Sequence, residues 1–275
     1  MRLIKGHLQA LREVVSTITK HRDLIWEMAR REVFDRYSGQ ILGAYWAIGH
    51  PLFLIGLYVF VFAFVFKQKI GGTHEMPLDY TTYLLSGLIP WMSLQEAMVK
   101  SCTAITSSSS IVKQTIFPLE ALPSKGVVAS LLTQIISSCF LVFYVLFTHG
   151  GLPWTYALVP LLMLFQIFIM LGVAFFLSAA GVFLKDTKDV VQLFATAGMY
   201  LLPVIYLPSW VPSLFKPLLY LNPFSHVIWC YQDLLYFGRF EHPWSWLVML
   251  LLSFTTLSMG YRLFRLTKPL FGNVL

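Results

Sequence analysis

The stretch WTYALVPLLMLFQIFIMLGVAFFLSAAGVFL, residues 154–184, holds 31 residues without a charged side chain. An α-helix needs about 20 apolar residues to cross the roughly 30 Å of hydrocarbon in a bilayer. We therefore predict a membrane-spanning helix here, and because it is too long for a straight crossing it must tilt, bend or project from the bilayer. It would pack closely against other helices through its small residues, which are Gly172, Ala174, Ser178, Ala179 and Gly181.

The rest of the chain is similarly apolar. Of its 275 residues 57% are hydrophobic and 12% are charged, whereas a soluble domain has about 45–50% and about 25%. The apolar residues form blocks of about 20 without the alternation of β-barrel strands. The predicted fold class is all-α, a polytopic membrane protein. Its six predicted transmembrane helices cover residues 47–66, 80–98, 126–147, 154–184, 190–207 and 244–263.

Lysine and arginine predict the orientation of these spans. With a cytoplasmic N-terminus, the segments inside carry 16 of the 20 basic residues and the segments outside carry 4. Such a bias places both termini in the cytoplasm, and it explains the net charge of +7 without nucleic acid as a partner. The first 40 or so residues are too polar for a cleaved leader, so the first apolar block is expected to be a span.

Residues 20–45, KHRDLIWEMARREVFDRYSGQILGAY, have helix-forming composition with mixed charges. On a helix Leu24, Met28 and Arg31 fall on one side, and three charged side chains share another. We predict an amphipathic helix along the cytoplasmic interface within an N-terminal region of residues 1–45. The alternative is an ordinary solvated helix.

Residues 208–243 differ from both a span and a loop. They contain two apolar segments of about 9 and 14 residues, each too short to cross a membrane, and Asn222-Pro223 separates them. We predict a periplasmic re-entrant helical hairpin before the last span and cytoplasmic tail, residues 244–275. His226 follows the turn and is expected to cap or pack within the hairpin.

The stretch SSSSIVKQTIFPLEALPSK, residues 107–125, lies between the second and third spans, on the predicted cytoplasmic side. Its serines are suited to N-caps, and Pro118 and Pro123 limit the helix that follows. We predict two helical turns, Ile111–Phe117, with Phe117 and two neighbouring polar side chains facing outward toward a protein partner. The alternative is a solvated connector whose Phe117 tucks under a neighbouring span.

Five stretches, in this order, resemble the membrane subunits of ABC exporters for bacterial polysaccharides such as O-antigen, capsule and teichoic acid. They are RYSGQILGAYWAIGHPL (36–52), YLLSGLIPWMSLQEA (83–97), IVKQTIFPLEALP (111–123), VFLKDTKDV (182–190), and LLPVIYLPSWVP followed by LNPFSHVI (201–228). The resemblance implies one permease domain over residues 1–275, with five spans in residues 47–207. It also implies a homodimer in the bacterial inner membrane that pairs with two copies of a separate ATPase.

The resemblance also assigns roles to residues. It implies a coupling helix at about residues 110–122, and we expect a second ATPase contact in the turn at 184–189, unless that turn is only a polar stop. The expected ATPase-coupling residues are Ile111, Lys113, Gln114, Phe117, Pro118, Glu120, Lys185 and Asp186. The expected interface or gate residues are Arg30, Arg31, Arg36 and Tyr37. The chain has no GxxxxGK[ST] phosphate loop, so ATP and Mg²⁺ are expected on the partner and no cofactor on this chain.

Aromatic residues could line a path for sugar. Tyr58, Phe62 and Phe66 recur at four-residue spacing, and the resemblance adds Tyr200 and Tyr206 to the candidate glycan path. Sugar rings present C–H faces that pack on aromatic rings. The alternative is that these side chains serve packing or face lipid, as aromatic stripes at this spacing usually do.

Catalytic and metal-binding patterns are not evident. Glu96 is the only charge near a span interior, and Lys100 one turn on predicts an ion pair rather than a proton relay. The three cysteines and seven histidines have no metal-ligand or redox spacing.

The sequence thus predicts the non-enzymatic permease of an ATP-driven exporter of lipid-linked, O-antigen-like polysaccharide. The alternatives are a permease of the same fold for teichoic acid, capsule, a drug or a small lipid, and an integral membrane transferase acting on lipid-linked sugars. The predicted partners are the ATPase, a second copy of the chain, the glycan and membrane lipids.

Overall fold

The computed structural model describes residues 2–35, 37–65, 77–114 and 117–275, and every regular element in these ranges is helical. The longer helices are α1 (Arg2–Lys20), α2 (Arg22–Asp35), α3 (Trp46–Val59), α4 (Tyr80–Thr103), α6 (Ala121–His149), α7 (Val159–Phe183), α8 (Thr187–Leu201), α10 (Pro223–Gln232) and α11 (Pro243–Thr267). The short ones are α5 (Ser109–Gln114), α9 (Lys216–Leu221) and α12 (Phe271–Val274). Two π-helical segments, Phe60–Val65 and Asp233–Phe237, continue α3 and α10.

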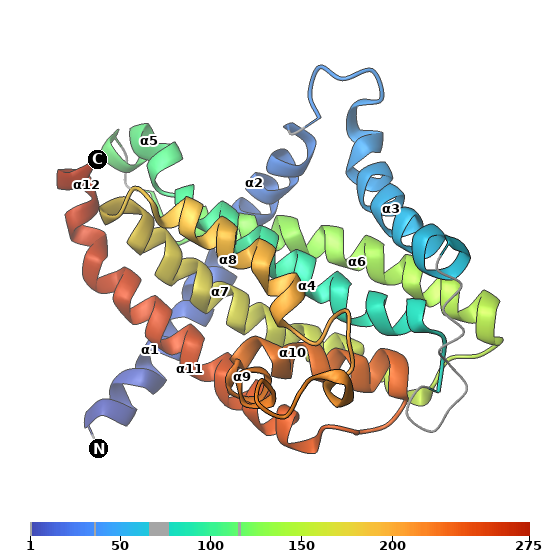
Figure 1. The fold of residues 1–275 in the computed structure, drawn as a ribbon. Helices are drawn as coiled ribbons and strands as arrows, with labels where there is room; N and C mark the ends of the chain where they lie inside the picture. The colour runs from blue at the N-terminus through green and yellow to red at the C-terminus, as the bar shows by residue number, and fades with distance from the viewer. Residues whose placement is uncertain (1, 36, 66–76, 115–116) are drawn as a thin grey trace.

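Helices α4, α6, α7, α8 and α11 lie side by side as the body of the molecule (Figure 1). Helix α4 is central, because nearly every residue from Tyr80 to Leu94 is buried, polar ones such as Thr82 and Ser86 included. It begins at Asp79, whose carboxylate accepts a hydrogen bond from the Thr82 backbone N–H at 3.2 Å. Burial on all sides fits a helix that contacts α6, α7, α8 and α10.

The predicted spans coincide with helices. Three helical stretches in the described ranges are long and apolar enough to cross a membrane: Ala121–His149, Trp154–Phe183 and Pro243–Val274. A shorter apolar helix covers Trp46–Phe62. Helices α4 and α8 lie where the second and fifth spans were predicted, but α4 is more polar and α8 has only 15 residues. The count of six crossings therefore stays a prediction.

The uncharged stretch at residues 154–184 divides into a 3-10 segment, Trp154–Leu158, and α7. Its small residues do allow close packing. A Cβ added at Gly172 would lie 2.3 Å from the backbone carbon of Thr256 on α11, and one added at Gly181 would lie 1.9 Å from the Cys102 carbonyl oxygen on α4. No side chain fits there, so glycine is required for this helix contact.

The N-terminal region differs from its prediction. Instead of one helix over residues 20–45 there is the shorter α2, which begins at Arg22 and ends at Asp35, before a segment in which Gly39 and Gly43 have positive φ. Such backbone angles are incompatible with a continuing helix. The buried face is also one residue away from the predicted one, because Ile25 and Ala29 are buried whereas Leu24 is exposed. Helix α1 was not predicted.

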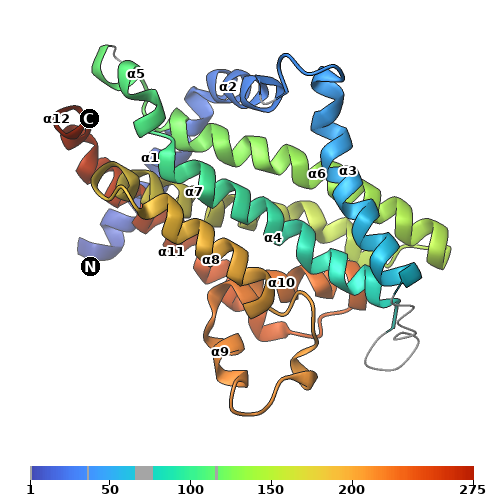
Figure 2. The same cartoon turned by 45° about the horizontal axis from the view of Figure 1, so that its top comes forward.

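Chain segments that the predicted topology assigns to one side of the membrane do gather at one end of the body. We call it the α5 end; it comprises residues 104–114, 117–120, 184–186 and 268–275 (Figures 1 and 2). Helix α1 lies against α11, and α12 packs against α5. The opposite end carries Asp79, the end of α6 and the segment with α9 and α10.

Candidate functional site

Helix α5 is the most prominent feature of the α5 end. It begins at Ser109, two residues earlier than predicted, and is described through Gln114; Thr115, Ile116 and the side chain of Gln114 lie outside the described parts. Lys113 is exposed, and Ile111 is partly buried. Phe117 is partly buried and packs against the hydrophobic core, which favours the alternative of a tucked ring over an outward one.

The segment after α5 joins it to α6. The carbonyl oxygen of Pro118 accepts the Ala121 N–H at 2.9 Å, and Pro123 lies in the first turn of α6. A proline is tolerated there because the first N–H groups of a helix have no partner within it. The coupling helix predicted at 110–122 is therefore shorter, and Pro123 belongs to the next helix.

Glu120 was expected to contact the ATPase, and the structure gives its carboxylate a partner within the chain. The ammonium of Lys268, just after α11, lies 2.7 and 3.0 Å from the two Glu120 oxygens. Glu120 is 8% exposed, so little of it is accessible to another protein. The pair fixes the start of α6 to the C-terminal segment.

The turn with Lys185 and Asp186 lies at the same end, with both side chains exposed. Phe271 of α12 is buried between Phe183, with ring centroids 6.2 Å apart, and Phe264, at 5.5 Å. Helix α12 therefore packs against α5 and the end of α7 together. The two segments predicted to contact the ATPase therefore both lie at the α5 end, next to α12.

Glu32 on α2 connects three helices. Its carboxylate lies 3.1 Å from the Lys100 ammonium on α4 and 3.5 Å from the Lys125 ammonium on α6. Lys100 also lies 3.1 Å from Glu96, which confirms the predicted ion pair. The side chains in this Glu32 cluster (Glu32, Glu96, Lys100 and Lys125) are about one-fifth exposed, so their interactions are less screened than those of surface pairs. Sequence spacing predicts only the Glu96–Lys100 pair.

A cavity of about 310 Å³ lies beside the Glu32 cluster. Its walls come from α2, α3, α4 and α6, with Gln192 of α8, and Tyr37 and His50 line it. Of the other expected gate residues, Arg31 pairs with Glu27 at 3.1 Å and Arg30 lies over the Phe34 ring at 5.7 Å. Arg36 lies outside the described residues. The structure thus places one predicted gate residue, Tyr37, on this cavity.

The predicted glycan-path aromatics join a larger row of rings. Tyr58 and Phe62 stack at 6.4 Å, and Phe62 lies 5.5 Å from Tyr80. Tyr80 in turn stacks with Trp210 at 6.5 Å and with Tyr83 at 6.3 Å. Tyr80, Tyr83 and Trp210 were not predicted as path residues, although Tyr80 and Tyr83 lie in the predicted second span and Trp210 follows the fifth.

Tyr200 and Tyr206, two other predicted path residues, differ in how far they are exposed. Tyr200 is 65% exposed. Tyr206 is partly buried, and its carbonyl oxygen accepts a hydrogen bond from the Tyr83 hydroxyl at 3.0 Å. Phe66 lies outside the described residues.

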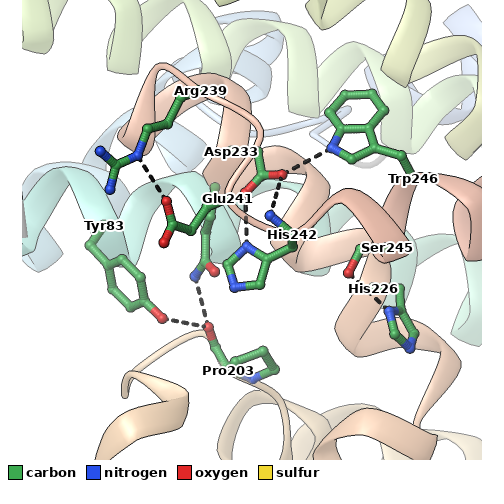
Figure 3. Close-up of polar contacts among 10 residues, drawn as sticks. Tyr83, Pro203, His226, Asp233, Arg239, Glu241, His242, Ser245 and Trp246 are labelled. Atoms are coloured by element: carbon green, nitrogen blue, oxygen red, sulfur yellow. Dashed lines mark hydrogen bonds and ion pairs between the residues drawn. The ribbon is translucent and has the colours of Figure 1, made fainter. Parts of the chain in front are cut away.

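The segment predicted as a hairpin contains α9 and α10, joined at Asn222. The Asn222 side chain accepts from the Phe224 N–H at 3.1 Å and so caps α10 at the predicted turn. One ring nitrogen of His226 lies 3.0 Å from the Ser245 hydroxyl (Figure 3). The other lies 3.0 Å from the Tyr220 carbonyl oxygen, so the ring packs between α10, α9 and the start of α11.

Asp233, which the sequence analysis missed, is wholly buried in the π-helical turn after α10. Its carboxylate accepts from the His242 backbone N–H at 3.1 Å and the Trp246 indole N–H at 2.9 Å, and lies 2.8 Å from a His242 ring nitrogen (Figure 3). A buried carboxylate is tolerated only with such partners. It ties the segment to the start of α11.

Two buried glutamines connect α10 to the body. Gln134 on α6 and Gln166 on α7 exchange amide hydrogen bonds of 2.8 and 2.9 Å, and both bond the Tyr231 hydroxyl. Gln232 donates to the Pro203 carbonyl oxygen at 2.7 Å. Polar contacts of this kind hold helices together where the hydrophobic effect contributes little. No cluster of three metal-ligating side chains occurs among the residues that the structure describes.

This architecture defines a class of protein: a helical membrane protein with several apolar helices long enough to cross a bilayer. Residues 23–236 match the family described as ABC-2 type transporter, and the chain belongs to this family of membrane domains. It is a multi-pass membrane protein and a transport subunit. Members lack an ATPase domain and a cofactor of their own and pair with a nucleotide-binding ATPase subunit.

Its relatives include proteins named O-antigen export system permease protein RfbA. One from Klebsiella pneumoniae is 25% identical over 259 residues, which cover 92% of this chain and 95% of the relative. A second from that organism is 23% identical with the same coverage. One from Myxococcus xanthus is 26% identical over 82% of this chain and 85% of the relative.

Proposed function

We propose that this protein is the permease of an ATP-driven exporter that moves a lipid-linked, O-antigen-like polysaccharide across a bacterial inner membrane. The names of the relatives support the substrate class. In this proposal the chain forms one permease domain with six crossings and both termini in the cytoplasm. It acts as a homodimer with two ATPase copies.

The observation that carries the proposal is the exposed surface at the α5 end. Lys113 of α5 and the turn at Lys185 and Asp186 are exposed there, and α12 braces them against the body. Such a surface suits a soluble partner that pushes on α5 during its ATP cycle.

Ion pairs connect the segments next to the ATPase to the other helices, and could transmit a movement of α5. Glu120 and Lys268 tie the segment after α5 to the end of α11. The Glu32 cluster ties α2 to α4 and α6, next to the cavity. A rigid displacement of α5 and α2 would therefore change the cavity walls rather than be absorbed locally. The aromatic row at the opposite end then provides ring faces for sugar.

Site-specific cross-linking to the co-expressed ATPase tests the coupling surface. The exposed Cys139 is first replaced with serine, and the buried Cys102 and Cys230 stay. Lys113→Cys should then form an adduct with the ATPase. Ser16→Cys, exposed on α1, and Thr148→Cys, exposed at the opposite end, serve as controls. An adduct at neither Lys113→Cys nor Lys185→Cys would contradict the assignment.

Deletion of the gene tests the substrate. Loss of surface polysaccharide, restored by the wild-type chain, is the expected result. An unchanged surface glycan with altered sensitivity to drugs would favour a permease for small molecules instead. Transferase turnover by the purified chain without any ATPase would favour an enzyme on lipid-linked sugars.

A further inference from the structure

Two open depressions lie where α1 rests on α11, away from the surfaces described above. They measure about 600 and 520 Å³ and share Tyr261 and Arg265. Arg12 lines one and Arg262 lines the other. Three arginines from two helices therefore meet at one crossing.

The charges at this crossing do not cancel. Arg265 pairs with Glu13, the one carboxylate among the described residues that line either depression. Arg262 lies 3.1 Å from a ring nitrogen of His7, which carries no negative charge. Arg12 is exposed and forms no ion pair with another described residue. Two guanidinium groups are thus left for an external anion, and guanidinium is suited to phosphate because it can donate two parallel hydrogen bonds.

An apolar stripe runs along α11 and the turn after it, next to these arginines. Met259, Leu263, Leu266 and Leu270 recur at helical spacing and are 63%, 36%, 73% and 49% exposed. In a helix these positions share one side, and Arg262 and Arg265 flank it toward α1. Charge and apolar surface lie side by side, as a molecule with an anionic head and an apolar tail requires.

We infer that the crossing of α1 and α11 binds the headgroup of an anionic phospholipid, held by the arginines that line the two adjoining depressions, with its acyl chains along the apolar stripe. The inference rests on the proposed orientation, which places this crossing at the cytoplasmic leaflet. Basic pockets between helices on that side hold anionic headgroups in membrane proteins. The Glu13–Arg265 ion pair connects α1 directly to α11. A bound lipid would add a second connection between the two helices.

Retention of lipid by the full-length purified protein tests this site. Protein is exchanged into mixed micelles of phosphatidylglycerol and phosphatidylcholine, and the lipids that stay bound are identified by native mass spectrometry. The wild type should retain phosphatidylglycerol preferentially. The double variant Arg12→Gln/Arg262→Gln should lose this retention by about tenfold or more.

A matched control removes the same charge elsewhere. Lys216→Gln/Arg239→Gln neutralises two basic residues at the opposite end and should retain lipid like the wild type. Leu266→Ser tests the stripe and should weaken retention while leaving the arginines intact. Elution volume and melting temperature confirm that each variant is folded.

Three results would overturn the inference. The first is equal retention of phosphatidylglycerol by the arginine variant and the control. The second is complete displacement of the lipid by inorganic phosphate together with no effect of Leu266→Ser, which would identify a soluble anion as the ligand. The third is a disulfide between two copies at Arg12→Cys, which would show that a second chain covers the crossing.

Discussion

The ammonium group of Lys268 lies 2.7 and 3.0 Å from the two carboxylate oxygens of Glu120, and so joins residues 148 positions apart in the chain. Lys268 follows α11, and Glu120 precedes α6. The contact connects the C-terminal segment to the region that follows α5. We therefore expect it to matter both for stability and for transmission of movement from α5.

Glu120→Gln should lower the free energy of unfolding by about 1–2 kcal/mol, because it removes the charge from a mostly buried hydrogen-bonded pair. It should also reduce export while leaving ATPase binding intact. Melting temperature, export and co-purification of the ATPase measure these effects. The charge swap Glu120→Lys/Lys268→Glu should recover part of both losses, and a swap no better than the single variant would contradict a direct pair.

The Glu32 cluster should control how α2 moves with the body. Glu32→Gln weakens contacts to both Lys100 and Lys125, and we expect export to fall several-fold while ATP hydrolysis continues. Glu27→Gln on the same helix removes an exposed pair with Arg31 and should have little effect, since exposed pairs contribute about 0–1 kcal/mol. Equal export by the two variants would exclude a transmitting role for Glu32.

The packing of α7 on α11 should be intolerant of a single methyl group. A Cβ at Gly260 would lie 2.0 Å from the Gly172 carbonyl oxygen, so Gly260→Ala must push two backbones apart. Overpacking costs about 1–3 kcal/mol or more, and a clash with backbone belongs at the upper end. Gly56→Ala on α3 is the control, because its Cβ would meet no heavy atom within 4 Å. Similar melting temperatures for the two variants would refute this packing.

Hydropathy was sufficient to locate the long apolar helices. Helices α6, α7 and α11 each form one apolar stretch, and their small residues indicate where helices approach closely. The information is local, since crossing a bilayer constrains each helix separately. The Asn222 cap and the Glu96–Lys100 pair were predictable for the same reason, because their partners lie within one helical turn.

Interactions between distant segments could not be predicted in this way. The partners of Glu32 and Glu120 lie on other helices, and no spacing rule connects them. Helix α4 was located as a span, but its sequence does not show that protein buries it on every side, because polar residues such as Thr82 and Ser86 are buried as well. The start of α5 was missed because several consecutive serines offer equivalent N-caps.

The pH dependence of stability should show the contribution of Asp79, the N-cap of α4. Burial acts to raise its pKa, but hydrogen bonds from Thr82, His149 and Tyr144 together lower the pKa below its ordinary value. A lowered folded-state pKa gives stability that is complete above the unfolded pKa of about 3.9 and is lost as the pH falls through the folded value.

Melting temperatures measured between about pH 3 and pH 6 test this expectation. The wild type should lose more stability on acidification than Asp79→Asn, whose curve should be flatter and lower near pH 6. Asp23→Asn replaces a carboxylate that is 95% exposed and should follow the wild-type curve. Parallel curves for wild type and Asp79→Asn would show that the ionised carboxylate does not stabilise the fold.

Asp233 should determine whether the segment with α9 and α10 stays closed on α11. Asp233→Ala leaves the His242 backbone N–H and the Trp246 indole N–H without their acceptor, and a buried donor left unsatisfied costs about 1–3 kcal/mol. Asp233→Asn keeps the shape of the side chain but turns an amide N–H donor toward the His242 and Trp246 donors, so it should also destabilise the fold.

Cys230, buried three residues away, is a native reporter of opening, and Cys102 near the α5 end is an internal control. In the Cys139→Ser background, maleimide should label Cys230 much faster in Asp233→Ala than in the parent, while Cys102 stays protected. Glu241→Gln removes the exposed pair with Arg239 nearby and should not change labelling, because that pair is solvated. Unchanged labelling of Cys230 in both Asp233 variants would show that the segment is held by its apolar contacts and the Gln134–Gln166–Tyr231 hydrogen bonds instead.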